Sequence, residues 1–375
     1  MKTKTIIIML AFIICLTLVI LIRQLTAGRF AVHQLDFYDN GADWRDFHLT
    51  NISANKDSSR LIIAGDDALL ISPVCKTKFP FNEIILCWNC FAGDSSGLAI
   101  SIAASPDNVN WWNFAYQNWR VESDIGAIDE DSLPRKKISG AGFVDIDIIK
   151  LEKPAIYYKF KIVFSHKDSL PFYLDRISIC YSNIHADIRQ HGIWGKHQMA
   201  DLPKVALAVP FLSQKALPDS ISDRTCSPTS LAMVLNYHNH QCSPLEVSAA
   251  VYDPFAEIYG NWPYNIQAAY LMGLQKTWIG RHNSFFEIAS EINSGKPVII
   301  SIDIPPAKLA NAPYPTTGGA GHLIVVRGFD GEGNVLVNDP AGENPHEGMV
   351  AYDLKALTEI WVERGGVAYH LWPEP

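Results

Sequence analysis

Thr-Cys-Ser-Pro-Thr-Ser-Leu-Ala-Met-Val-Leu-Asn-Tyr, at residues 225–237, is the stretch that decides the fold of the second half of the chain. Apolar residues recur at helical spacing in its second half, which predicts a helix with one buried face. Thr225 is a candidate cap, and Pro228 suits a first turn because no N–H is needed there. The sulfur of Cys226 is then expected at the positive end of the helix, where a thiol has a lowered pKa and can act as a nucleophile. The alternative is a small buried cysteine that only begins a core helix.

A histidine that can share the proton of this thiol stands in the segment 318–330, Gly-Gly-Ala-Gly-His-Leu-Ile-Val-Val-Arg-Gly-Phe-Asp. His322 opens an apolar run that predicts a strand, and a turn and a returning strand follow. The start of one strand of such a hairpin lies beside the end of the other, so we expect His322 and Asp339 to meet. A catalytic thiolate needs a histidine, and the histidine needs an acceptor that orients it. Asp330 is a rival for this last role, but it stands at the turn.

Acyl transfer also needs a donor for the oxyanion, and Gln214 can supply one beside the backbone N–H of Cys226. The motifs follow one another in this order: Pro-Phe-Leu-Ser-Gln at 210–214, Cys-Ser-Pro-Thr-Ser at 226–230, Gly-His at 321–322 and Asn-Asp-Pro at 338–340. In these motifs, residues 203–372 resemble the papain-like cysteine peptidases. Among them they are similar to the bacteriocin-processing, double-glycine peptidases, which form cysteine peptidase family thirty-nine.

This resemblance implies a helical lobe that carries the cysteine, followed by an antiparallel sheet that carries the histidine and the carboxylate. It implies no cofactor and no metal. The site residues it implies are Gln214 in the oxyanion hole, Cys226 as nucleophile, His322 as general base and Asp339 as the orienting carboxylate. The residue after the cysteine is often glycine in the family, and a serine at position 227 is expected to narrow access to the sulfur.

The other elements expected in this half follow from caps, prolines and apolar runs. We predict helices at 243–251, 266–273 and 284–294, and strands at 298–302, 352–361 and 368–372. A loop at 305–317 is long enough to form a rim of the active site. Cys242 is a weaker candidate nucleophile, because neither a helix start nor a glutamine serves it.

The chain has 375 residues, which is enough for two domains with sizeable cores. Its formal net charge of −8 gives no basic surface of the kind that binds nucleic acid, so no nucleic-acid partner is expected. Lys2 and Lys4 precede an apolar run at 6–22, which predicts a secretory signal or a membrane anchor within residues 1–28. The end of that segment is a poor cleavage site. We therefore favour an anchor in the membrane, with the rest of the chain extracytoplasmic.

Residues 30–182 predict an antiparallel β-sandwich of jelly-roll type, because short alternating runs are separated by polar turns. These runs lie at 61–64, 83–88, 98–102, 144–148, 157–164 and 174–179. At the level of pattern, this part resembles galactose-binding-like and carbohydrate-binding sandwiches, which implies a cell-surface glycan or peptide as a partner. Residues 183–202 are polar and predict a linker to the second domain at 203–375.

Three groups of residues in the first half have both a structural and a functional interpretation. The aromatic group either stacks on a ligand or, as we favour, fills the core and an interface; its members are Trp111, Trp112, Tyr116 and Trp119. The cysteines can form disulfides in an exported chain, with no pairing deducible, and two of them have redox-motif spacing without a following helix; they are Cys75, Cys87, Cys90 and Cys180. The linker histidines match no zinc pattern; they are His185, His191 and His197.

The sequence thus predicts an α+β protein with an anchor or signal helix, a β-sandwich and a papain-like peptidase domain. Its predicted function is that of an extracytoplasmic cysteine peptidase acting on a peptide or protein. Two alternatives stay open. One is a non-catalytic cell-surface binding protein with a relic peptidase domain, and the other is an acyl transferase that uses the same triad.

Overall fold

The computed structural model describes residues 32–54, 60–121, 140–185, 202–303, 309–313 and 321–374. The expected anchor or signal helix at 1–28 lies outside these ranges, as do His191, His197 and most of the loop at 305–317. In the described ranges, we find no helix that is both long and apolar enough to cross a membrane.

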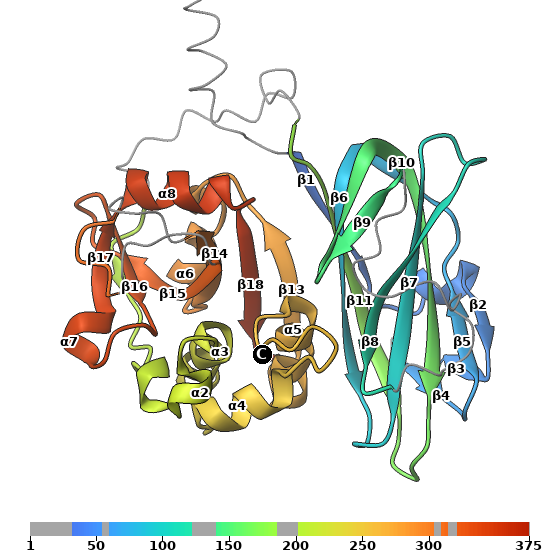
Figure 1. Ribbon diagram of the computed structural model, residues 1–375, viewed down its shortest axis with the longest axis horizontal. Coiled ribbons are helices and arrows are strands. Elements are labelled where there is room, and N and C mark those ends of the chain that lie inside the picture. Colours follow the sequence, from blue (N-terminus) through green and yellow to red (C-terminus); the bar gives the residue numbers. More distant parts are fainter. Residues whose placement is uncertain are drawn as a thin grey trace, which may run out of the picture.

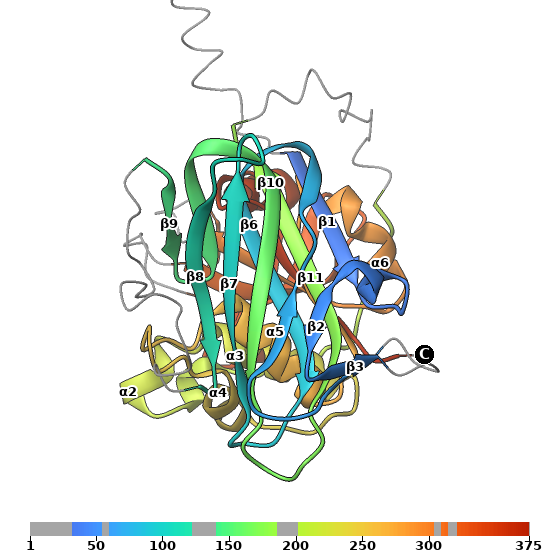
Figure 2. The ribbon, with the colours of Figure 1, turned by 90° about the vertical axis from the view of Figure 1, so that its right-hand side faces the viewer.

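Residues 32–183 form an antiparallel β structure, here called the N-terminal β part (Figure 1). Its elements are β1 (Val32–Tyr38), a 3-10 turn (Asp43–Asp46), β2 (His48–Thr50), β3 (Ile52–Ala54), β4 (Leu61–Ile63), β5 (Ala68–Ile71), β6 (Cys75–Phe91), β7 (Gly97–Ser105), β8 (Trp112–Trp119), β9 (Gly142–Asp145), β10 (Ile148–Ser165) and β11 (Tyr173–Asn183). The long strands β6, β10 and β11 lie side by side in the order β10-β6-β11, and Figure 2 looks onto these strands. Alternate side chains of the strands meet in one hydrophobic core.

One alternating run in this part was wrongly predicted as a single strand. Residues 144–148 instead span the end of β9, a two-residue turn with Ile146 at a φ of 59°, and the first residue of β10. Alternation of apolar and polar residues cannot distinguish a strand from a tight turn whose two ends are both buried. The turn places the carboxylate of Asp147 in a buried position against the C-terminal part of the chain.

Residues 202–374, here called the C-terminal part, contain a mixed arrangement of helices around a second antiparallel sheet (Figure 1). Its elements are β12 (Val205–Ala206), a 3-10 turn (Gln214–Ala216), α2 (Asp219–Ser222), α3 (Cys226–Tyr237), α4 (Pro244–Val251), α5 (Trp262–Leu271), β13 (Lys276–Arg281), a 3-10 turn (Phe285–Glu287), α6 (Ala289–Asn293), β14 (Val298–Asp303), β15 (Gly321–Phe329), β16 (Asn334–Asn338), α7 (Pro345–Gly348), β17 (Met349–Asp353), α8 (Leu354–Glu363) and β18 (Val367–Trp372). The strand order is β13-β18-β14-β15-β16-β17, with β12 beside β15.

The two faces of this sheet bury different sets of helices. Leu323 and Val325 of β15 pack in the same core as α3, α4 and α5, whereas Ile324 and Val326 pack with α6 and α8. This alternation is the period of two that a strand imposes. Because β15 is covered on both faces, its apolar run is nearly continuous, and its start is fixed next to α3.

Three elements of the C-terminal part differ from the prediction. Residues 354–361 form helix α8 rather than a strand, because Asp353 caps it by accepting from the N–H of Ala356 and its apolar residues follow helical spacing. Helix α5 begins at Trp262, with Asn261 as its cap, rather than at residue 266. The helix expected at 284–294 is split into a 3-10 turn and the short α6.

The N-terminal β part and the C-terminal part share a buried interface. Ile85, Cys87 and Cys180, on the face of β6 and β11 that looks away from the first core, belong to the same hydrophobic cluster as α3 and α5. The amide of Gln267 on α5 accepts from the N–H of Cys90 (3.0 Å) and donates to its carbonyl (2.6 Å). The N-terminal β part and the C-terminal part are therefore joined by core packing as well as by chain connection.

Candidate active site

Helix α3 begins at Cys226, so the sulfur lies at the N-terminal end of the helix, where unpaired N–H groups favour an anion. Cys226 is partly exposed, while the rest of the first two turns is buried. Thr225 occupies the cap position without capping through its side chain; its hydroxyl donates to the carbonyl of Ser222 (3.1 Å). The expectation that Thr225 caps the helix is wrong in this detail, but the position of the sulfur does not depend on it.

His322 and Asp339 lie together at the end of the β15–β16 hairpin, as their positions in the sequence predict. The Nε2 atom of His322 is 2.7 Å from Oδ1 of Asp339, and both residues are buried, with exposed fractions of 3% and 0%. The side chains of His322 and Cys226 also interact, since each is among the groups that shift the pKa of the other. The thiol, the imidazole and the carboxylate thus form one interacting series.

Cys226 and His322 each change the pKa of the other. Burial raises the pKa of the Cys226 thiol, but the hydrogen bond and charge of His322, with smaller effects of two backbone N–H groups, outweigh it and hold the pKa below its ordinary value. Burial likewise lowers the pKa of His322, but the charge and hydrogen bond of Asp339 and the contact with Cys226 raise it to about 10. Both directions favour a thiolate beside an imidazolium at neutral pH.

Asp339 is held by three groups that fix both of its oxygens. Oδ1 also accepts from the N–H of Ala341 (3.0 Å), and Oδ2 accepts from the hydroxyl of Tyr352 (3.0 Å). The rival Asp330 instead accepts from Glu332 and Asn334 within its own turn. Sequence reasoning missed Tyr352, because its place on β17 beside the hairpin follows from strand pairing rather than from any local motif.

Gln214 is buried beside the start of α3. Its Nε2 donates to the carbonyl of Ser222 (2.7 Å), which is also the acceptor for Thr225, the residue before Cys226. Its Oε1 is buried and has no hydrogen-bond partner among the described residues. A glutamine amide carries two N–H donors, so one remains after the bond to Ser222. The backbone N–H of Gln214 bonds to the carbonyl of Pro340, which ties this segment to the hairpin that carries Asp339.

Ser227, the residue expected to narrow access to the sulfur, has its side chain engaged elsewhere. Its fully buried hydroxyl donates to Oδ1 of Asn265 (2.9 Å) and lies 3.1 Å from the hydroxyl of Tyr369. The expected narrowing of access to the sulfur is therefore not found. One turn further, the hydroxyl of Ser230 donates to the carbonyl of Leu323 (3.0 Å), which fixes α3 against the strand that begins with Gly321 and His322.

The other candidate residues of the sequence do not form a second centre. All six cysteines of the described ranges are free thiols; Cys87 faces the shared core, and Cys90 lies in the core of the N-terminal β part. Burial raises the pKa of Cys242 to about 11, which argues against a nucleophile there. No cluster of three or more metal-ligating side chains occurs in the described ranges, and His185 is exposed.

The aromatic group divides between the core and the surface. Tyr116 and Trp119 are buried in the core of the N-terminal β part, and Trp112 packs against that core. Trp111 lies under the ammonium group of Lys159, at 4.4 Å from ring centre to nitrogen. Three members of the group therefore have a structural role, and the group forms no continuous exposed platform.

Comparison with known proteins identifies the C-terminal part. Residues 206–369 match the Peptidase C39 like family, so this part of the chain is a C39-like peptidase domain. Among solved structures, the chain is similar to a C39-like peptidase from Bacillus anthracis, with 20% identity, 46% of this chain and 98% of that chain covered, and a TM-score of 0.34.

Two further solved structures resemble the chain. One is a double-glycine-motif protease from an AMS/PCAT transporter in complex with the leader peptide, with 20% identity, coverage of 46% and 97%, and a TM-score of 0.30. Another is the C-terminal CBM6 of LamC from Zobellia galactanivorans, with 10% identity, coverage of 39% and 98%, and a TM-score of 0.20. No curated protein sequence matches the chain.

Proposed function

We propose that this protein is a cysteine peptidase that hydrolyses a peptide or amide bond, with Cys226 as nucleophile, His322 as acid and base, and Asp339 as the orienting carboxylate. The observation that carries the proposal is the interacting series of thiol, imidazole and carboxylate at the start of a helix, inside a C39-like domain. A thiolate in that position is stabilised by the helix N-terminus and by the imidazolium.

The reaction proceeds in two steps, which are acylation of Cys226 and hydrolysis of the resulting thioester. The Cys226 thiolate forms a bond to the carbonyl carbon, and the oxyanion that develops is held by the backbone N–H of Cys226 and the remaining N–H of Gln214. His322 gives its proton to the leaving amine as the C–N bond breaks. Water then attacks the thioester, its proton passes to His322, and the acid product leaves with the thiolate regenerated.

The fixed position of Asp339 supports its role in both steps. Three donors, from His322, Ala341 and Tyr352, hold the carboxylate in one orientation, so the imidazole keeps Nε2 toward Asp339. An acyl transferase would use the same groups with an amine in place of water, and product analysis separates the two activities. A relic domain, the remaining alternative, has no need of the charge arrangement at Cys226 and His322.

The wider setting is part of the proposal. We infer an extracytoplasmic location, with the apolar segment within residues 1–28 as anchor or signal. The N-terminal β part, as a β-sandwich, would bring the peptidase to a glycan or peptide at the cell surface. The buried interface between the two parts supports joint action on one substrate.

Incubation of the full chain with a diverse peptide library, followed by mass spectrometry, tests the proposal. We expect cleavage products from the wild type and none from Cys226→Ala, because alanine removes the sulfur with little change in packing. Cys242→Ala is the matched control and should cleave as the wild type does. Cleavage by Cys226→Ala at the wild-type rate would refute the assignment of Cys226 as the nucleophile.

A further inference from the structure

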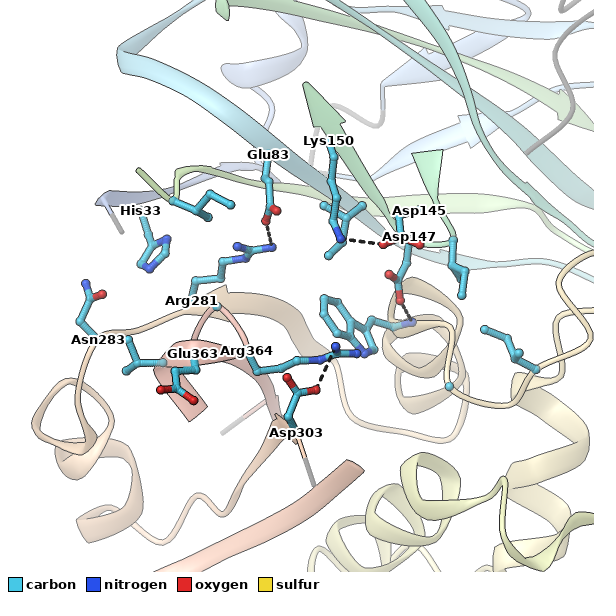
Figure 3. A pocket seen from close by; sticks show the side chains of 18 residues that line it. His33, Glu83, Asp145, Asp147, Lys150, Arg281, Asn283, Asp303, Glu363 and Arg364 are labelled. Carbon is cyan, nitrogen blue, oxygen red and sulfur yellow. Dashed lines mark hydrogen bonds and ion pairs between the residues drawn. The ribbon is translucent and has the colours of Figure 1, made fainter. Parts of the chain in front are cut away.

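Side chains of the N-terminal β part hold the start of helix α5. Asp147, in the turn between β9 and β10, accepts through Oδ2 from the backbone N–H of Trp262 (2.9 Å). Figure 3, which looks into the cavity beside this turn, shows the Asp147 carboxylate pointing toward that helix start. On β8, Gln117 accepts through Oε1 from Nδ2 of Asn261, the cap of α5 (3.0 Å). The first turn of α5 is therefore bonded to two separate segments of the β part.

The turn that carries Asp147 is itself held in an unusual conformation. Ile146 has a φ of 59°, which a β-branched residue seldom adopts, so the surrounding structure has to hold it there. Its carbonyl accepts from Nε2 of Gln117 (2.7 Å), and the carbonyl of Asp147 accepts from the hydroxyl of Tyr116 (2.5 Å). Gln117 thus fixes the turn with one end of its amide and the cap of α5 with the other.

From Asn261, hydrogen bonds continue along α5 to the neighbour of the nucleophile. Nδ2 of Asn265 donates to two backbone carbonyls, of which one is that of Asn261 (2.8 Å). Because both amide protons are used there, Oδ1 of Asn265 faces Ser227 and accepts from its hydroxyl (2.9 Å). Three hydrogen bonds therefore lead from Gln117 to Ser227, the residue after Cys226. Gln117, Asn261, Asn265 and Ser227 are here called the amide series.

The amide series is buried, and its hydrogen bonds are complete. The exposed fraction is 6% for Gln117 and 0% for Asn261, Asn265 and Ser227. Every side-chain nitrogen and oxygen of the three amides has a partner. Buried amides cost free energy unless they are fully bonded, and a fully bonded network fixes the orientation of the groups within it. The series therefore fixes Ser227 relative to β8 as well as relative to α5.

Ser227 acts on the thiol through its backbone. Burial raises the pKa of Cys226, while His322 and the backbone of Ser227 are among the groups that hold it below its ordinary value. The Ser227 side chain lies between the amide series and the hydroxyl of Tyr369, at 3.1 Å. His322 and Tyr369 are titratable groups that share an electrostatic effect with Cys226, and neither belongs to the series. A displaced Ser227 would therefore change the thiol with both of these groups still in place.

We propose that Gln117, Asn261 and Asn265 are positioning residues of the peptidase, through which the N-terminal β part holds Ser227 and so sets the reactivity of Cys226. The inference rests on the proposed function and deepens it. The β part then acts on the active site directly, in addition to any ligand that its surface binds. This role requires no contact between the three amides and the substrate.

The rate at which iodoacetamide alkylates Cys226 tests this role on the full chain. The rate is followed by mass spectrometry of the Cys226 peptide between about pH 5 and pH 10, because the thiolate is the reactive form. Gln117→Met keeps the size of the side chain but removes the acceptor of Asn261 and the donor to Ile146. We expect the acid limb of the profile to move up by about one pH unit, which makes alkylation about tenfold slower below the limb. For a cleaved peptide from the library, kcat should fall with little change in KM.

Gln267→Leu is the matched control for the junction between the two parts. Gln267 also lies on α5 and bonds to the β part, through both backbone groups of Cys90, but it is not a member of the amide series. Its loss should weaken the junction and leave the pH profile of Cys226 unchanged. The comparison separates a positioning role from a general loss of stability.

Ser227→Ala cuts the amide series at its other end. Effects of independent sites multiply in a double variant, whereas sites that act through one another do not. We therefore expect the double variant Gln117→Met, Ser227→Ala to react at about the rate of the slower single variant. Ser227→Ala also keeps the proposal falsifiable where Gln117→Met does not fold, because a wild-type profile in that variant would overturn it.

The outcomes distinguish this inference from the proposed function. A folded Gln117→Met variant with the wild-type pH profile would overturn the positioning role, even with Cys226 fully reactive. An equal shift in Gln267→Leu, or effects that multiply in the double variant, would do the same. A wild-type profile whose acid limb lies at about pH 8.5, as for an ordinary thiol, would overturn the proposed function and the positioning role with it.

Discussion

Replacement of Asp339 by asparagine tests the charge arrangement of the site. Asparagine keeps the size of the side chain and one carbonyl oxygen, so Nε2 of His322 and the N–H of Ala341 retain an acceptor. The new amide nitrogen would face Tyr352, whose hydroxyl can rotate to accept instead of donate. We therefore expect Asp339→Asn to fold and to lose the charge, with little change in the packing around it.

The size of the effect follows from the pKa of His322. A rise from 6.5 to about 10 corresponds to about 5 kcal/mol of preference for the imidazolium, shared between Asp339 and Cys226. If Asp339 supplies about half, its charge is worth about 2–3 kcal/mol, which is about a hundredfold in the affinity of the imidazole for its proton. The imidazolium persists up to the folded pKa and is lost as pH rises through it. Loss of Asp339 should therefore move the alkaline limb of the pH profile to lower pH.

The assay is the pH dependence of Cys226 alkylation by iodoacetamide, with kcat/KM for a cleaved peptide from the library measured alongside. Asp330→Asn is the matched control, because it removes a carboxylate charge at the other end of the same hairpin and should leave the profile unchanged. A folded Asp339→Asn variant with the wild-type alkaline limb would refute the reasoning, since the proton on His322 would then not depend on Asp339.

Four further changes have distinct expected results. Gln214→Ala should lower kcat about 10- to 100-fold with little change in KM, measured by steady-state kinetics, because it removes an oxyanion donor. Tyr352→Phe should lower the free energy of unfolding by about 1 kcal/mol and activity by less than tenfold, seen in denaturant titration and peptide assays. Gln267→Leu leaves both backbone groups of Cys90 without this amide and should cost about 2–4 kcal/mol in the same titration. Asp147→Asn should stabilise the fold at pH 8 but not at pH 4. Burial raises the pKa of Asp147 in the folded chain from its ordinary value of 3.8 to about 7. Between these two values, folding takes up a proton, so the free energy of unfolding falls as the pH rises.

Local sequence patterns predicted most of the geometry of the candidate active site. The start of α3 at Cys226 follows from the proline in its first turn and from apolar periodicity. The contact between His322 and Asp339 follows from the predicted hairpin, in which the start of one strand lies beside the end of the other. The catalytic roles of these residues and of Gln214 remain predictions. The orientation of the Ser227 side chain could not be predicted, because its hydrogen-bond partners Asn265 and Tyr369 lie in elements that are distant along the chain.

The errors in the fold have physical causes of the same kind. Residues 354–361 contain large apolar and β-branched residues that suit a strand, and only the cap at Asp353 and the spacing of the buried residues reveal α8. The run at 144–148 alternates as a strand does, yet the backbone reverses at Ile146. The pairings across the junction, such as Gln267 with Cys90, join residues far apart along the chain, and no local pattern encodes them.

The hydrophobic cluster that takes in Ile85, Cys87 and Cys180 together with α3 and α5 limits how this chain can be divided or recombined. A fragment that began at residue 202 would expose the apolar side of α5 to water and would carry an aggregation hazard that the whole chain lacks. Grafting a different β structure onto this C39-like domain would likewise require the matching contact face to be transferred with it. Evolutionary exchange of the two halves as separate building blocks is therefore constrained by the surface they bury together.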